Sequence, residues 1–144
     1  MRSMAPDMLY PLERTARWRD LLPPPVYELY AEALSVEKQS PRACTTLVGV
    51  TLEAVCQVEQ AKGTSLSEQL NDLVTSGRIP ATIGEMAQHL RYLRNIGVHV
   101  THEKVTEEDI PVLLEVLEAI LEYLYVFPAT MHALQTRVET KGTI

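Results

Sequence analysis

Prolines divide this chain into segments, and between them the apolar residues recur at three- and four-residue spacing. Pro23 to Pro25 interrupt any preceding helix, whereas Pro41, Pro80 and Pro111 stand where a new helix can begin. A proline in the first turn of a helix loses no backbone hydrogen bond, but a proline further inside breaks the ladder. No segment shows convincing alternation with a period of two. We therefore expect an all-α fold, a single-domain helical bundle of about five helices.

The expected helix bounds follow from these start signals and from glycine and proline stop signals. The helices run over residues 26–36, 41–62, 66–76, 80–96 and 110–127. Apolar residues cover most of the circumference of the second helix, so this helix should be the central one. The organisation that we expect is an N-terminal arm (1–25), a bundle domain (26–128) and a C-terminal tail (129–144).

Capping residues support several of these starts. Ser40 is an expected N-cap, and Ser65 with Glu68 three residues later forms a capping box, in which each residue bonds a free N–H group of the first turn. Thr106 and Asp109 form another expected box before the last helix.

Composition and charge limit the function. With 144 residues, of which 46% are hydrophobic, the chain can form one compact domain with a real core. The net charge of −6 argues against general coating of nucleic acid, so any RNA or nucleotide contact must be local. Glu115, Glu118 and Glu122 are expected to form a solvent-facing stripe on the last helix.

Cysteine use and hydropathy bear on the location of the protein. Cys44 and Cys56 lie twelve positions apart on one expected helix, about 18 Å along its axis, which forbids a disulfide between them and favours a place in the core. There is no apolar leader at the N-terminus and no uninterrupted apolar run of about 18 residues. We expect a cytoplasmic protein without a membrane span.

The N-terminal arm contains Arg14, Arg17, Trp18 and Arg19. Arginines can contact phosphate and tryptophan can stack on a base, but one aromatic among three arginines is a weak nucleic-acid signal. The favoured interpretation is that this run packs on the body of the protein or on a partner.

The candidate site is the segment LRYLRNIGVHVTHE, residues 90–103. Guanidinium groups bind oxyanions in a planar fork, and imidazole titrates near neutral pH, so Arg94 with His99 or His102 could bind a phosphate and move a proton. In an unbroken helix His99 would be rotated about 140° from Arg94. The hypothesis therefore expects a break near Ile96 and Gly97. The alternative is that basic residues in a last turn stabilise its free carbonyl groups and dipole.

Other chemistries are weaker. His99, His102 and Glu103, with His89, would be an incomplete set of metal ligands, because two histidines three positions apart do not close a site. The sequence contains no glycine-rich phosphate loop, Cys-x-x-Cys pair or serine nucleophile elbow. We expect neither a metal ion nor a cofactor.

Several sequence segments together resemble one known family. They are YP at 10–11, LPPPVYELYAEA at 22–33, RACTTLVGVTLEAVC at 42–56, the segment around 63–70, GRI at 77–79 and LRNIGVHVTH at 93–102. They are similar to the HEPN superfamily of helical nucleotide-binding domains, and within it to the domain of unknown function 4145.

The resemblance implies a small helical bundle that often dimerises, and in many members a metal-independent endoribonuclease with a toxin, phage-defence or RNA-processing role. Arg94 would hold the scissile phosphate, Asn95 would orient it, and a histidine would move the proton, which gives a 2′,3′-cyclic phosphate and a 5′-OH. The subfamily tends to read R-x-x-G-N with a histidine four residues later. Here Val98 replaces that asparagine and His102 has the histidine place, so both His99 and His102 are candidates.

The resemblance also implies the partners. They are a second copy of the chain, an RNA or nucleotide ligand, and an antitoxin or defence-system protein. The competing hypothesis is a noncatalytic interaction or sensing module for nucleotide or RNA, in which the same residues cap a helix or hold a dimer.

Overall fold

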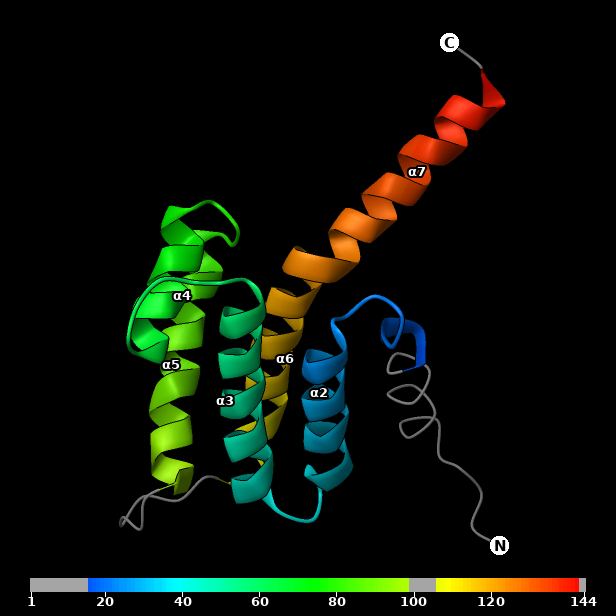
Figure 1. The fold of residues 1–144 in the computed structure, drawn as a ribbon. Helices are drawn as coiled ribbons and strands as arrows, with labels where there is room; N and C mark the ends of the chain where they lie inside the picture. The colour runs from blue at the N-terminus through cyan, green and yellow to red at the C-terminus, as the bar shows by residue number, and fades with distance from the viewer. Residues whose placement is uncertain (1–15, 99–105, 143–144) are drawn as a thin grey trace, which may run out of the picture.

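The fold is an all-α bundle from which one helix projects (Figure 1). The computed structural model describes residues 16–98 and 106–142, and from 90 to 98 it describes the backbone alone. The elements in these ranges are α2 (Pro24–Val36), α3 (Pro41–Val58), α4 (Leu66–Thr75), α5 (Ala81–Val98), α6 (Ile110–Leu121), the π-helix η1 (Glu122–Val126) and α7 (Phe127–Lys141). No strand occurs in the described residues, and the prediction of an all-α helical bundle is confirmed.

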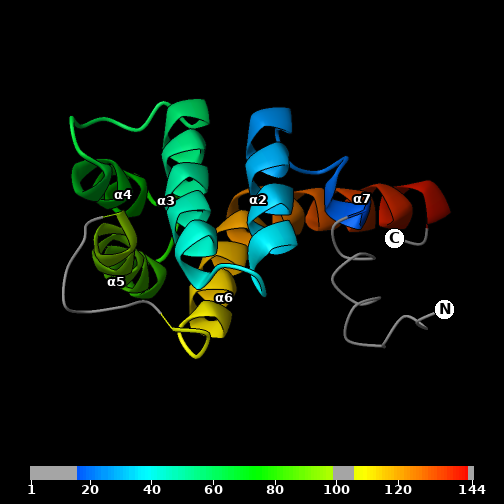
Figure 2. The same cartoon turned by 90° about the horizontal axis from the view of Figure 1, so that it is seen from below.

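Helix α3 is the centre of the bundle. It contacts α2, α4, α5 and α6, and seen from below it lies between α2 and the α4–α5 pair (Figure 2). Cys44 and Cys56 are both fully buried on it and are free thiols. The predicted central helix and the predicted core role of its cysteines are therefore confirmed.

Hydrogen bonds at the helix starts match the sequence. The Ser40 hydroxyl accepts the Ala43 N–H at 3.1 Å, and the Ser65 hydroxyl accepts the Glu68 N–H at 3.2 Å. The Thr106 N–H donates to the Asp109 carboxylate at 2.9 Å, before α6. The caps expected at Ser40 and Ser65 are confirmed, whereas the Thr106–Asp109 contact lies before α6, and no side-chain hydrogen bond caps that helix.

The end of α3 differs from the prediction. The helix ends at Val58 and not near Lys62, because Gln60 has a φ of 55° and the N–H groups of Gln60 and Ala61 turn back onto the carbonyls of Gln57 and Cys56. This left-handed closure normally uses glycine, so Gly63 was the wrong stop signal.

The C-terminal part also differs. The prediction that the last bundle helix ends before Pro128 is wrong, since α6 passes through η1 directly into α7. Pro128 lies in the first turn of α7, where its missing N–H is tolerated. Helix α7 buries no side chain and extends away from the bundle (Figure 1).

Candidate functional site

The predicted site residues lie at the C-terminal end of α5. Arg94 and Asn95 belong to the last turns of this helix, and their side chains lie outside the described part of the structure. His99 and His102 follow α5 and lie outside the described residues, as does Glu103.

The break expected near Ile96 and Gly97 is not present, because α5 is helical through both residues and up to Val98, the last residue that the structure describes before Thr106. A glycine inside a helix costs only about 1 kcal/mol relative to alanine, and the packing of α5 against α3, α4 and α6 can offset that cost.

The C-terminal end of a helix is a distinct electrostatic environment. Its final carbonyl groups have no partner within the helix, and the dipole makes this end negative. Arg94 lies four residues before Val98, the last described residue of α5, and the final described turn contains no basic residue.

Described residues elsewhere show little metal or membrane character. Of the two described histidines, His89 is exposed on α5 and His132 is exposed on α7. Within residues 16–98 and 106–142 no group of three or more His, Cys, Asp and Glu side chains could hold a metal ion. In the same ranges every helix is too short or too polar to cross a bilayer.

A groove of about 620 Å³ lies between α2, α6 and the first turn of α5. Apolar side chains line it, including Leu34 and Leu114, and glutamates surround them. The acidic side chains are Glu37, Glu115, Glu118 and Glu122. Such a groove repels phosphate and favours a ligand that is apolar and cationic.

The expected solvent stripe of α6 is therefore only partly exposed. Glu115 is exposed, but Glu118 and Glu122 are partly buried in the wall of this groove. The buried Tyr30 hydroxyl donates a hydrogen bond of 2.7 Å to Glu118. This contact joins residues 88 positions apart, so helical periodicity could not reveal it.

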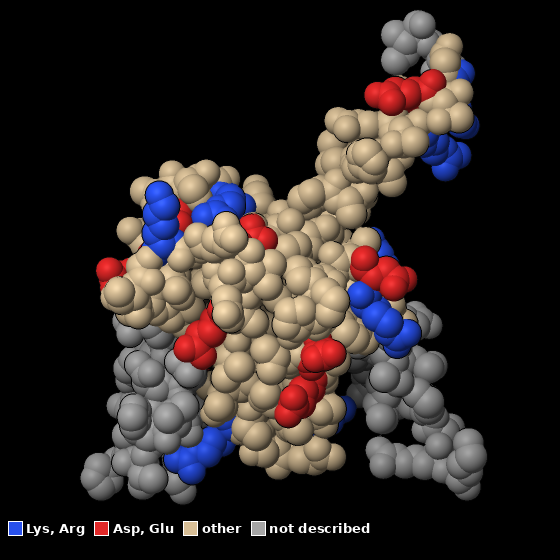
Figure 3. Space-filling view, in the orientation of Figure 1, with Lys and Arg blue, Asp and Glu red and all other residues tan. Residues whose placement is uncertain are grey.

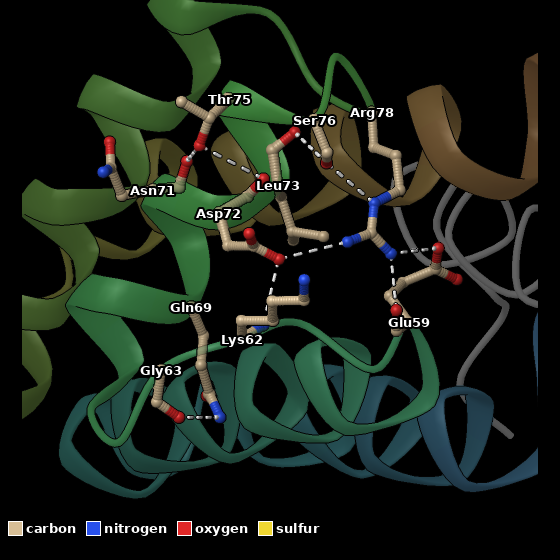
Figure 4. A network of polar contacts seen from close by, with 10 residues as sticks. All are labelled: Glu59, Lys62, Gly63, Gln69, Asn71, Asp72, Leu73, Thr75, Ser76 and Arg78. Carbon is tan, nitrogen blue, oxygen red and sulfur yellow. Dashed lines mark hydrogen bonds and ion pairs between the residues drawn. The ribbon is translucent and has the colours of Figure 1, made fainter.

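Arg78 is the centre of a polar network that sequence reasoning missed (Figure 4). Its guanidinium donates to the Glu59 carbonyl oxygen and forms ion pairs with Glu59 at 3.6 Å and Asp72 at 3.3 Å. The Asp72 carboxylate also accepts the Lys62 N–H at 2.9 Å, and Glu59 accepts the Tyr125 hydroxyl at 2.9 Å. The network joins α4, η1 and the end of α3. The role of Arg78 in these contacts is structural.

The N-terminal arginine and tryptophan run packs on the body where it is described. Trp18 is 2% exposed, and its ring stacks on Tyr30 with centroids 5.5 Å apart. The Arg19 guanidinium lies 5.9 Å from the centre of the Tyr27 ring. The favoured interpretation of Trp18 is confirmed.

Charged side chains are scattered over the face seen in Figure 3 and form no continuous basic patch there. Nonspecific nucleic-acid binding requires such a patch. On this face the distribution agrees with the expectation that any phosphate contact is local.

Comparison with known proteins places this chain in a family. Searches among curated proteins and among solved structures gave no match. A family model described as "Domain of unknown function (DUF4145)" matches residues 31–139, from α2 into α7. Because the match covers more than half of the 144 residues, this chain belongs to the DUF4145 family.

Proposed function

We propose that this protein is a metal-independent endoribonuclease of HEPN type, with a site formed by Arg94, Asn95, His99 and His102. One observation carries the proposal: α5 is helical through Val98 and packs against three other helices, so Arg94 and Asn95 stand on a supported helix, and His99 and His102 follow Arg94 in the sequence by five and eight residues. The sequence resemblance described above supports the same assignment.

The proposed site needs the chain to bend after the described part of α5. A residue inside the helix at position 99 would be rotated about 140° from Arg94. The proposal therefore requires that the chain leaves the helical path after Val98, the last residue of α5 that the structure describes. Arg94 remains attached to a helix that packs on three others, which gives the phosphate-binding group a firm base.

The proposed reaction is an internal transesterification of RNA. One histidine takes the proton of the ribose 2′-OH, and the oxygen attacks the adjacent phosphorus. The bond to the 5′ oxygen breaks, and that oxygen leaves with a proton from the other histidine or from water. Arg94 stabilises the charge on the phosphate and Asn95 orients it. The products are a 2′,3′-cyclic phosphate and a 5′-OH.

The proposal includes a homodimer in the cytoplasm. A two-fold axis would bring two copies of the Arg94 segment to one cleft, which would supply both an acid and a base for each phosphate. An endoribonuclease in a cell must be restrained, so an antitoxin or another defence-system protein is the proposed regulatory partner.

The second candidate is a noncatalytic module that binds RNA, nucleotide or protein. A specific observation favours it: α5 stays helical through Gly97 to Val98, where the subfamily tends to have Gly-Asn. In this alternative Arg94 stabilises the free carbonyl groups of the last turn and the histidines serve binding.

RNA cleavage in the presence of EDTA tests the proposal. The wild-type chain should convert mixed RNA to fragments with 2′,3′-cyclic phosphate ends. Arg94→Ala and His99→Ala should each reduce the rate by about a hundredfold or more, as expected for loss of charge stabilisation or proton transfer. His102→Ala determines which histidine is required.

The controls separate chemistry from folding. His132→Ala removes an exposed histidine on α7 and should leave cleavage unchanged. Arg94→Lys keeps the charge but loses the planar fork, so its rate should lie between those of wild type and Arg94→Ala. Absence of cleavage by folded wild type would reject the nuclease, and RNA or nucleotide binding without cleavage would favour the module.

A further inference from the structure

Helix α7 carries an apolar stripe that the bundle does not cover. Phe127, Met131, Leu134 and Val138 are between 39% and 55% exposed, and their spacing of four, three and four places them on one side of the helix. The main contact of α7 is with η1. Isolated helices of this length are marginal in water, so a 15-residue helix of this kind requires packing that one copy does not provide.

The basic residues of α7 flank this stripe. Arg137 follows Leu134 by three positions and Lys141 follows Val138 by three, so both lie along the same edge of the stripe. Glu139 lies on the other side of the helix, and Figure 3 shows basic and acidic side chains on opposite sides of α7. The stripe is therefore apolar with a basic edge.

The groove between α2 and α6 has the complementary character. Its floor is apolar, and Ala119 in the row of α6 residues facing it leaves room for a close neighbour. Among the side chains that the structure describes, no lysine or arginine forms an ion pair with Glu37, Glu115 or Glu122. An apolar helix with a basic edge fits both features.

Groove and stripe form one continuous surface. Tyr123 and Phe127 line the groove, their rings lie edge to face at 5.9 Å, and Phe127 also begins the stripe. One end of this surface is thus acidic and concave, and the other is basic and convex. A two-fold axis places the acidic groove of one copy against the basic-edged stripe of the other, and the reverse. An isologous dimer needs this self-complementarity.

We propose that two copies of this chain exchange α7, with the stripe of each α7 lying in the α2–α6 groove of the other copy. Arg137 and Lys141 then face the groove glutamates, and Met131 and Leu134 cover its apolar floor. The lengths agree, because α7 spans about 22 Å and the α6 row from Pro111 to Glu122 spans about 17 Å.

This contact is separate from the shared cleft proposed for RNA cleavage. Figure 1 shows α7 leaving the bundle at the end opposite to the one where α5 ends. The proposed exchange of α7 therefore does not depend on a catalytic role of Arg94 and its neighbours.

The first test is the oligomeric state of the full chain by sedimentation velocity at tens of micromolar. Wild type should be a dimer that weakens as salt rises, because screening reduces the charge contacts. Leu134→Glu should be monomeric. Thr136→Glu adds the same charge at an exposed position on the side of α7 opposite to the stripe, and it should remain a dimer.

Charge reversal identifies the occupant of the groove. One variant carries Arg137→Glu and Lys141→Glu, and the other carries Glu115→Lys and Glu122→Lys. Each alone should be monomeric, because like charges then meet at both contacts. An equimolar mixture should form a heterodimer, because opposite charges meet again at both. Glu28→Lys with Glu85→Lys, at exposed positions outside the groove lining, is the matched control and should remain a dimer.

Three results would overturn the exchange. A monomeric wild type would show that no second copy binds. A dimeric Leu134→Glu would show that the apolar stripe is not part of the contact. A groove-reversed variant that still dimerises while Leu134→Glu does not would assign the contact to direct pairing of the two α7 helices.

Discussion

Tyr30 shows what a single buried polar group contributes. It is fully buried between Trp18 and α6, and its hydroxyl donates to the Glu118 carboxylate at 2.7 Å. Hydrogen bonds to charged acceptors contribute more to stability than hydrogen bonds between neutral groups. Loss of the donor leaves the acceptor without that bond.

Tyr30→Phe should lower the free energy of unfolding by about 2 kcal/mol, because the ring stays and the bond to a carboxylate is lost. Urea unfolding measures the change. Tyr123→Phe, on an exposed ring, is the matched control and should have little effect. Equal stability of the two variants would contradict the assigned hydrogen bond.

The thiols of the two cysteines should be unreactive in the native protein. Burial raises the pKa of Cys44 to about 12 and that of Cys56 to about 11. The thiolate is the reactive form, and both pKa values lie about three units or more above pH 8. Almost no thiolate is present at that pH, so neither thiol should react with a disulfide reagent. Both should react in denaturant. Rapid reaction of either thiol in the folded protein would show that α3 is less enclosed than described.

At the scale of elements, Gly84 fixes how closely α4 and α5 approach. A Cβ atom at this position would lie within van der Waals overlap of the Val74 side chain. The need for a small residue is steric here, since Gly84 lies inside α5.

Gly84→Ala should destabilise the protein by about 1–3 kcal/mol, because the inserted methyl group overpacks this contact. Val74→Ala in the same chain should recover part of the loss by making room. Thermal unfolding of both single variants and the double variant gives the interaction free energy between positions 74 and 84. Additive losses would mean that the two residues do not meet.

The capping box of α4 should give a pH-dependent contribution. Hydrogen bonds from the Thr64 and Ser65 side chains lower the pKa of Glu68 in the folded state. A depressed pKa contributes stability above the ordinary value near 4.5, and this stability is lost as pH falls through the folded value. Glu68→Gln should thus be less stable than wild type at neutral pH, with the difference shrinking in acid. Glu85→Gln is the control, and a pH-independent difference would argue against the carboxylate.

The predictability of these elements depended on the range of the interactions that form them. Ser40 and Ser65 could be identified because a cap is made within three residues. The end of α3 could not, because Gln60 adopts a left-handed conformation that glycine usually takes. Arg78 gave no signal, since its partners come from α3 and α4 and meet only in the fold.

At the scale of the whole molecule, the sequence predicted the bundle and its central helix but not the groove or the projecting helix. The groove combines α2 and α6, which are more than 70 residues apart in the chain. Helix α7 has only a narrow apolar stripe and carries Pro128 in its first turn, so local patterns favoured a stop. The site at 90–103 stays a prediction from spacing and resemblance.

Loss of the outer part of α7 should leave the bundle intact. A chain ending at Ala133 should have the same unfolding free energy as full-length Leu134→Glu within about 1 kcal/mol, because α7 buries no side chain in its own copy. The comparison uses that variant because dimerisation stabilises wild type by mass action. A loss of several kcal/mol would mean that α7 supports its own bundle.

The π-helix at Glu122–Val126 has a consequence for how this molecule could change over generations. A π turn holds one residue more than an α turn, so losing a single codon there would restore regular winding without unfolding either flank. The residues beyond it would keep their direction around the helix axis, because the wider turn already absorbs the extra residue, whereas a deletion inside α7 would rotate the residues beyond it by about 100°. The apolar stripe of α7 should therefore keep its direction after a one-residue loss in η1, but not after the same loss within α7.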